Sequence, residues 1–271
     1  MSSAPVLACR ADFLLPLTAP DRARRIADGY VLSEGERLIE VGPYDAAVGL
    51  RLRARYGERL QVLGGALLRP ETAGDPLPRL RGVLLPAFVK AHGHDHEQPL
   101  IGIAKDEPLT AWLDHAVNPF TGFINRHRAE LSAELGCTPQ LATYRMARLC
   151  DLHYGITASM VHHCNHNKYH LEDVALANES AGTTMIVAVG GQDRYYVEEL
   201  LDRPEQALER LDRALRIQAD CRRTSFCPGP DQLFSNSRRV LVPQKRWARE
   251  HGTLFHVHSA EEPATTRWFQ A

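Results

Sequence analysis

The sequence of 271 residues contains no apolar run of the ~18 residues that a membrane-spanning helix needs. Its start, MSSAPVLACRADFLLPL, lacks the basic region, unbroken apolar stretch and small-residue cleavage site of a secretory signal. An excess of charge is also missing, since 32 basic and 33 acidic residues leave a formal net charge of -1. We therefore expect a cytoplasmic protein that binds a small molecule rather than nucleic acid or a membrane.

Cysteine pairs of the CxxC type are absent too. A chain of this length can bury a core without disulfides, so we predict reduced thiols at all six cysteines: Cys9, Cys137, Cys150, Cys164, Cys221 and Cys227. Histidine, by contrast, is abundant. Ten of the 13 histidines lie in three short stretches, 92–96, 162–170 and 251–258. These stretches are the main candidates for a functional site.

Residues 1–85 carry short apolar or alternating runs separated by turn-rich segments, a pattern typical of β-strands. One helix is expected around residues 46–58. The sequence thus predicts a small β-rich, sandwich-like domain over residues 1–85.

From residue 86 onward, strand-like and helix-like segments alternate. Strands are expected at 83–89, 155–163, 183–189, 224–228 and 253–258, and helices at 138–153, 169–181, 204–221 and 237–251. Such alternation predicts a parallel sheet covered by helices, as a barrel or a doubly wound sheet. The histidines follow the first, second and fifth strands, and (β/α)8 barrels carry their catalytic groups at these ends. We therefore predict an α/β fold with a partial TIM-type barrel, about five of eight strands, over residues 86–271.

The pair His92-Gly-His94 follows the first predicted strand of this barrel. Residues two apart on an extended chain point the same way, so both imidazoles can reach one ion about 2.0 to 2.1 Å away. Taken alone, the His92–His94 pair is explained equally well as two polar residues in a loop between a strand and a helix. His258 offers a third nitrogen, and Glu261 can take a proton from water beside the ion. The spacing predicts hydrolysis by metal-activated water, with Glu261 as the catalytic residue.

With these motifs the sequence resembles the amidohydrolase superfamily, in its branch of cytosine and guanine deaminases and triazine hydrolases (chlorohydrolases). The resemblance rests on Leu85-Pro-Ala-Phe-Val-Lys-Ala-His92-Gly-His94, His258-Ser-Ala-Glu261, Leu109-Thr-Ala-Trp-Leu113, Tyr154-Gly-Ile-Thr157 and Cys227-Pro228. It implies that His92, His94 and His258 hold one divalent ion, zinc or alternatively iron, and that Glu261 is the proton shuttle. It also implies a further histidine and an aspartate beyond residue 271, so we expect a C-terminally truncated chain whose own activity is open.

The resemblance implies deamination of an amino-substituted N-heterocycle, by a protein that can be a homo-oligomer. One alternative is an inactive remnant or metal-binding scaffold, and another is a hydrolase of cyclic amides or chloro-heterocycles in the same superfamily. Gly229 stands where members acting on adenosine-like compounds commonly carry a histidine, which weighs against nucleoside deamination. Lys90 replaces the asparagine that is more usual before Ala-His.

A further histidine cluster, residues 161–170, follows the second predicted strand at the rim where barrel loops contact substrate. We predict His162 and His163 as substrate contacts, against the alternative of a solvated polar loop. His96 is expected in a loop or behind the ligands. His256 alternates with His258 and is expected at most behind the ligands.

Overall fold

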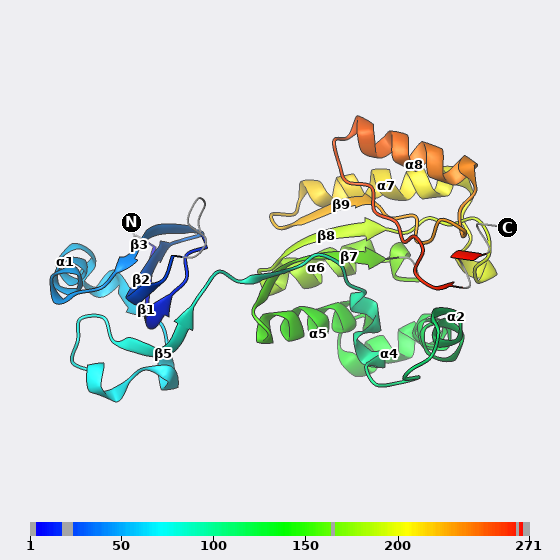
Figure 1. Cartoon of the computed structure of the whole chain (residues 1–271). Coiled ribbons are helices and arrows are strands. Elements are labelled where there is room, and N and C mark those ends of the chain that lie inside the picture. Colours follow the sequence, from blue (N-terminus) through cyan, green and yellow to red (C-terminus); the bar gives the residue numbers. More distant parts are fainter. Residues whose placement is uncertain (1–3, 18–23, 164–165, 264–265, 268–271) are drawn as a thin grey trace. The chain divides into compact units, whose positions relative to one another are not determined.

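The computed structural model describes residues 4–17, 24–163, 166–263 and 266–267. The chain divides into two compact units, Met1–Pro86 and Ala87–Ala271, each built around its own hydrophobic core (Figure 1). Among the described helices, none is both long enough and apolar enough to cross a membrane.

The smaller unit is a five-stranded sheet with one helix. Strand β1 lies inside the order β3-β2-β1-β4 and also pairs with β5; β1, β2 and β3 are antiparallel, whereas β4 and β5 run parallel to β1. The elements are β1 (Val6–Leu14), β2 (Ile26–Glu34), β3 (Arg37–Pro43), α1 (Ala46–Tyr56), β4 (Leu60–Val62) and β5 (Arg79–Leu84), with single 3-10 turns at Gly57–Arg59, Gly65–Leu67 and Pro70–Thr72. Leu52 of α1 packs against Val6, Ala8 and Leu32, so the apolar alternation of the strands builds this core.

The larger unit is built on a parallel sheet of four strands in the order β6-β7-β8-β9. Its strands are β6 (Phe88–Lys90), β7 (Ile156–His163), β8 (Thr184–Val189) and β9 (Thr224–Pro228). The helices that follow or precede these strands are α5 (Pro139–His153), α6 (Leu171–Ala181), α7 (Pro204–Ala219) and α8 (Arg238–Glu250). Helix α5 packs on β7, α6 on β8 and β9, and α7 and α8 on β9.

Shorter helical segments lie between the strands of this unit. After β6 come η4 (Asp95–Leu100), α2 (Leu109–Trp112), η5 (Leu113–Val117), α3 (Asn118–Arg126) and α4 (Arg128–Leu135). After β7 and β8 come η6 (His166–Tyr169) and η7 (Glu198–Leu200). All of them lie in segments that follow strand C-termini, the end at which a barrel builds its active site.

The alternation of side chains along β7 separates the core from the opposite face of the sheet. Val161 packs in the core with Leu171 and Val174 of α6 and Leu211 of α7. Its neighbour His162, also fully buried, points to the other face. The helices therefore pack on the face of the sheet to which Val161 points, and His162 lies on the other face.

The predicted single buried strand over residues 83–89 is wrong. Residues 79–84 form β5 of the smaller unit and 88–90 form β6 of the larger, with Pro86, which has no N–H to donate, between them. The segment is also not buried throughout: Val83 is 50% and Val89 72% exposed.

The segment 253–258, predicted as a fifth strand, is extended but forms no regular ladder. Its backbone bonds to the end of β9 and to the segment after it are His256 N to Pro228 O (3.0 Å), His258 N to Asp231 O (2.8 Å) and Leu233 N to His258 O (3.4 Å), and His258 makes one isolated bridge with Gln232. Strand β9 ends at Pro228, and Asp231 has a positive φ of 45°, so the segment has no straight partner beyond that point. The parallel sheet of the described chain thus has four regular strands, not five.

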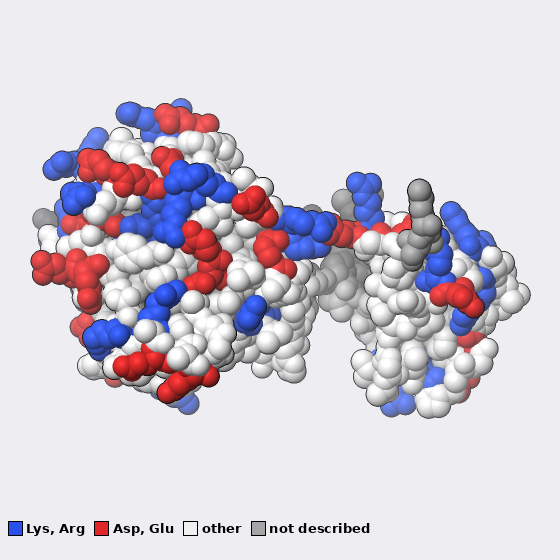
Figure 2. All heavy atoms as spheres, turned by 180° about the vertical axis from the view of Figure 1, so that it is seen from behind, with Lys and Arg blue, Asp and Glu red and all other residues white. Residues whose placement is uncertain are grey.

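Basic and acidic side chains are intermingled on the face of the larger unit seen in Figure 2. On this unit Arg213 of α7, for example, makes two bonds to Glu172 of α6, at 2.6 and 2.9 Å. Five cysteines are free thiols, namely Cys9, Cys137, Cys150, Cys221 and Cys227. Cys164 lies outside the described residues.

Candidate metal centre and active-site cavity

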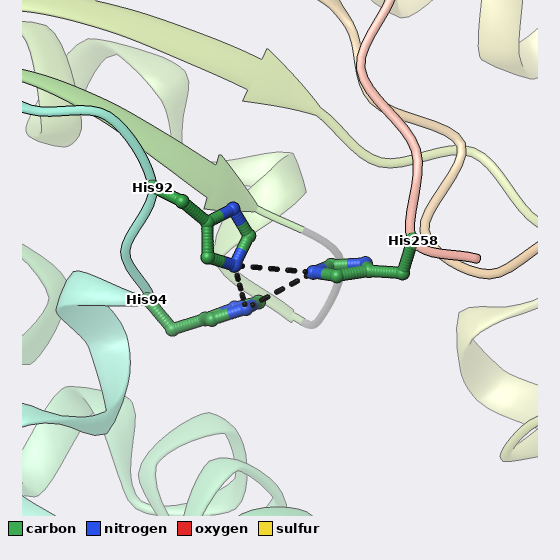
Figure 3. A group of neighbouring side chains, drawn as sticks. All are labelled: His92, His94 and His258. Atoms are coloured by element: carbon green, nitrogen blue, oxygen red, sulfur yellow. Dashed lines mark hydrogen bonds between the residues drawn. The ribbon is translucent and has the colours of Figure 1, made fainter. Parts of the chain in front are cut away.

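Three histidine side chains meet at the C-terminal end of β6 (Figure 3). The Nε2 atoms of His92 and His94 lie 3.1 Å apart, and His258 Nε2 lies 3.4 Å from the first and 3.2 Å from the second. His92 and His94 come from the turn after β6, and His258 comes from the extended segment that follows α8. The structure thus brings together the three residues predicted as ligands, although they are separated by up to 166 positions.

The donor set fits a small divalent ion. Three ligands at zinc–nitrogen distances around a tetrahedral ion lie about 3.3 Å from one another, close to the separations found here. Burial lowers the pKa of His92, and it lowers the pKa of His94 to about 4. Both imidazoles are therefore neutral near pH 7, which is the form that binds a metal.

Asp231 orients His258 from behind. His258 Nδ1 lies 3.2 Å from the backbone oxygen of Asp231 and 3.4 Å from its Oδ1. Because both oxygens accept, the hydrogen is on Nδ1, and the lone pair of Nε2 faces the other two histidines. Burial lowers the pKa of His258, but the hydrogen bond and negative charge of Asp231 outweigh it, and the pKa is raised.

Sequence reasoning missed Asp231. One signal was present, because the residue closely follows the fourth predicted strand, Thr224–Pro228, and polar residues after barrel strands are functional candidates. Its positive φ of 45° is uncommon for a residue other than glycine and matches the tendency of functional loops to hold strained backbone.

A second pair of imidazoles lies behind the first three. His92 Nδ1 is 3.3 Å from His256 Nε2, and His256 Nδ1 is 2.8 Å from His162 Nδ1. Burial lowers the pKa of His256 to about 4 and holds the pKa of His162 well below its ordinary value. His256 therefore lies behind His92. The ring centroid of His162 lies 5.0 Å from that of His256 and 4.2 Å from that of His258, so His162 is next to both.

His163 faces the opposite side of the sheet. It is fully buried and hydrogen-bonds the hydroxyl of Tyr144 in α5, within the core, and burial lowers its pKa to about 3. Neither His162 nor His163 is among the residues that line the cavity beside His94 and His258. Their predicted contact with substrate thus has no support from their placement, and adjacent strand residues could not both have faced one cavity.

Glu97 lies beside two histidines of the first cluster. Its Oε1 is 3.1 Å from His96 Nε2 and 3.7 Å from His94 Nδ1. His96 is 1% exposed, and its ring centroid lies 5.7 Å from that of His94, so it is a buried neighbour of His94.

A cavity of about 750 Å³ opens beside the histidines. Its wall includes His94, His258 and Glu261 together with aromatic and acidic side chains, among them Trp112, Tyr195, Phe234, Glu107 and Asp114. Glu261 accepts a hydrogen bond from the amide of Gln232. Ala260, with a positive φ of 55°, makes the turn between His258 and Glu261. The predicted catalytic carboxylate thus lies on the same cavity wall as two of the three predicted ligands.

No family model matches the chain. The chain is 26% identical over 226 residues to the 5-methylthioadenosine/S-adenosylhomocysteine deaminase of Thermococcus onnurineus, covering 77% of this chain and 48% of that protein. It is 30% identical over 197 residues to the deaminase of the same name from Haloarcula marismortui, covering 69% of this chain and 39% of that protein. The chain therefore spans about half the length of the curated relatives it matches, or less.

Solved structures share the fold. A guanine deaminase from C. acetobutylicum with bound guanine superposes with a TM-score of 0.69 at 14% identity, over 96% of this chain and 54% of that one. A triazine hydrolase variant gives 0.64 at 14% identity, over 96% and 53%. An adenosine deaminase from Xanthomonas campestris with bound zinc gives 0.60 at 17% identity, over 97% and 51%. The predicted α/β fold with a partial TIM-type barrel is confirmed.

Proposed function

We propose that this chain, a member of the amidohydrolase superfamily, holds a divalent metal ion on His92, His94 and His258 and serves the hydrolytic deamination of an amino-substituted N-heterocycle. The observation that carries the proposal is the convergence of three Nε2 atoms within 3.1 to 3.4 Å of one another, beside a cavity that Glu261 also lines. The names of the relatives support the reaction class, because they are deaminases of purine derivatives.

The roles follow from the atoms that face the cavity. A bound divalent ion would supply the positive charge that makes water acidic near neutral pH. Glu261 has a carboxylate that can accept a proton from water and deliver it to the leaving nitrogen. The amide of Gln232 donates to this carboxylate and fixes its direction. We expect zinc, with iron as the alternative.

The cavity offers surfaces suited to a planar heterocycle. Trp112, Tyr195 and Phe234 offer aromatic surface, which packs well on flat rings. Members of the superfamily that act on adenosine-like compounds commonly carry a histidine at the position of Gly229. A Cβ atom at Gly229 would lie 2.6 Å from the carbonyl carbon of Ala188, so β8 occupies the space that such a side chain would need. We therefore favour a free base or a similar small heterocycle as substrate. A homo-oligomer and a cytoplasmic location stay predictions.

The first test is metal content. We expect about one zinc or iron ion per purified chain, and its loss on His92→Ala or His258→Ala, because two imidazoles bind far more weakly than three. His115→Ala is the matched control, since His115 is exposed and pairs only with Glu107 among the contacts described. Equal metal content in wild type and His258→Ala would overturn the proposed site.

The second test separates catalysis from binding. Glu261→Gln keeps the shape of the side chain but cannot take a proton, so it should retain the metal and lower the rate of ammonia release from aminated heterocycles by about 100-fold or more. Release of chloride or of a ring-opened acid instead of ammonia would favour the other hydrolases of the superfamily. An unchanged rate in Glu261→Gln would contradict the assigned role, and a wild-type chain that binds metal without turning over any of these substrates would favour a metal-binding scaffold.

A further inference from the structure

The turn that carries His92 and His94 rests on a cluster of four charged side chains that the proposed reaction does not use. Lys90 ends β6, Asp95 begins η4, and Arg148 and Asp151 lie one turn apart on α5. Asp95 is 3%, Arg148 1% and Asp151 8% exposed. The side chain of Lys90 is partly buried, at 22% exposure. Two cations and two anions are thus grouped together, so their formal charges balance.

The contacts of the cluster join the two ends of the ligand-bearing turn to its surroundings. Lys90 Nζ lies 2.9 Å from Asp95 Oδ1 and 2.8 Å from Asp151 Oδ2. Arg148 lies 2.9 Å from Asp151, and it also donates to Asp95 and to the hydroxyl of Ser159 in β7. The residues before His92 and after His94 are therefore tied to each other and to α5.

The side chain of Lys90 also lies directly under the turn. A Cβ atom at Gly93 would be 2.9 Å from Lys90 Cε and 3.1 Å from Cδ, so any side chain at this position would force the lysine stem to shift. On the other side, the oxygen of Gly93 accepts a bond of 2.8 Å from His162 N. The backbone between the two ligands is thus fixed from two directions.

Stability alone does not account for three buried charges and a partly buried fourth, because apolar residues of similar volume often stabilise a fold as well or better. We propose that Lys90, Asp95, Arg148 and Asp151 are positioning residues that hold His92 and His94 in the geometry of the metal site. The inference rests on the proposed metal site and adds to it the residues that set its affinity. Groups behind metal ligands typically change affinity by about 10- to 100-fold when they are replaced.

The test compares zinc affinity with stability in full-length variants. Lys90→Met removes the ammonium but keeps most of the stem. Asp151→Asn is a milder, isosteric change that keeps the Lys90–Asp95 pair. The control is Lys168→Met, because Lys168 is a lysine that is buried more deeply than Lys90 and is likewise paired with an aspartate. It bonds Asp202 (2.7 Å) and Leu200 O (2.6 Å), away from the 90–95 turn. Chelator competition measures the zinc affinity of each variant, and urea unfolding measures its stability. Amide exchange at residues 91–94, recorded without metal, measures the mobility of the turn.

We expect Lys90→Met to bind zinc about 10- to 100-fold more weakly than wild type, with a smaller loss in Asp151→Asn and less than about 3-fold in Lys168→Met. The exchange of the 91–94 amides should quicken in the first two variants only. If the wild-type chain binds zinc and Lys90→Met, Asp151→Asn and Lys168→Met all bind it with equal affinity, the positioning role is overturned and the proposed metal site is not. A wild-type chain that binds no zinc would overturn the proposed metal site and this inference with it.

Discussion

The proposed metal ligands gain their direction from atoms that do not face the cavity. His258 is held by Asp231, and His92 by His256, through their Nδ1 atoms. A neutral imidazole has one donor and one acceptor nitrogen, so the group behind each ring decides which nitrogen faces the metal. For His258 the acceptor behind the ring is an oxygen, which fixes the tautomer.

Replacement of Asp231 by asparagine should therefore weaken zinc binding by about 10-fold or more, because the oxygen behind His258 loses its negative charge. Chelator competition measures the effect. Asp193→Asn is the control, because Asp193 also follows a strand of the sheet but bonds Ser237, away from the ligands. A zinc affinity equal to that of Asp193→Asn would show that Asp231 does not orient the ligand.

At the scale of elements, the sequence predicted what is locally determined. The helix expected at 138–153 is α5, because Thr138 caps it and Pro139 fits its first position. The division of residues 83–89 and the missing fifth strand depend instead on pairing partners far along the chain, which periodicity does not reveal. The same limit applies to the candidate site. The proposed ligands could be predicted because they lie in short sequence motifs, whereas Asp231 and the charged cluster under the turn are brought to the site only by the fold.

The cap of α5 gives a test at this scale. Thr138 accepts a bond of 3.1 Å from Leu141 N, so Thr138→Ala should lower the free energy of unfolding by about 1 kcal/mol. Thr138→Ser keeps the hydroxyl and should stay close to wild type. Urea unfolding followed by circular dichroism measures both variants, and equal losses in the two would mean that the cap bond contributes nothing.

For the whole molecule, the distribution of histidine matters: all 13 lie between residues 92 and 258, within the larger unit. Burial lowers the pKa of His163 to about 3, away from the cavity. A histidine with a depressed pKa stabilises the fold fully above its unfolded value of about 6.5, and this contribution is lost as the pH falls toward the folded value. In the smaller unit, the bond from Arg69 lowers the pKa of Asp12 to about 2, so its contribution persists until the pH falls below about 4.

We therefore expect acid to loosen the larger unit first. Between pH 7 and pH 5, amide exchange followed by mass spectrometry should show falling protection in peptides from residues 87–263 and little change in residues 24–86. His163→Gln removes one titrating group and should reduce the fall. Equal losses in both parts of the chain would contradict the assignment of acid sensitivity to the buried histidines.

The distance along the chain between the ligands has a consequence for biosynthesis. His94 and His258 are separated by 164 positions, with β7, β8 and β9 between them. A ribosome therefore releases the first two ligands long before the third, and a nascent chain cannot close the three-histidine site until those strands have formed. Ion capture by all three histidines would therefore mark the end of synthesis of this region rather than guide its beginning.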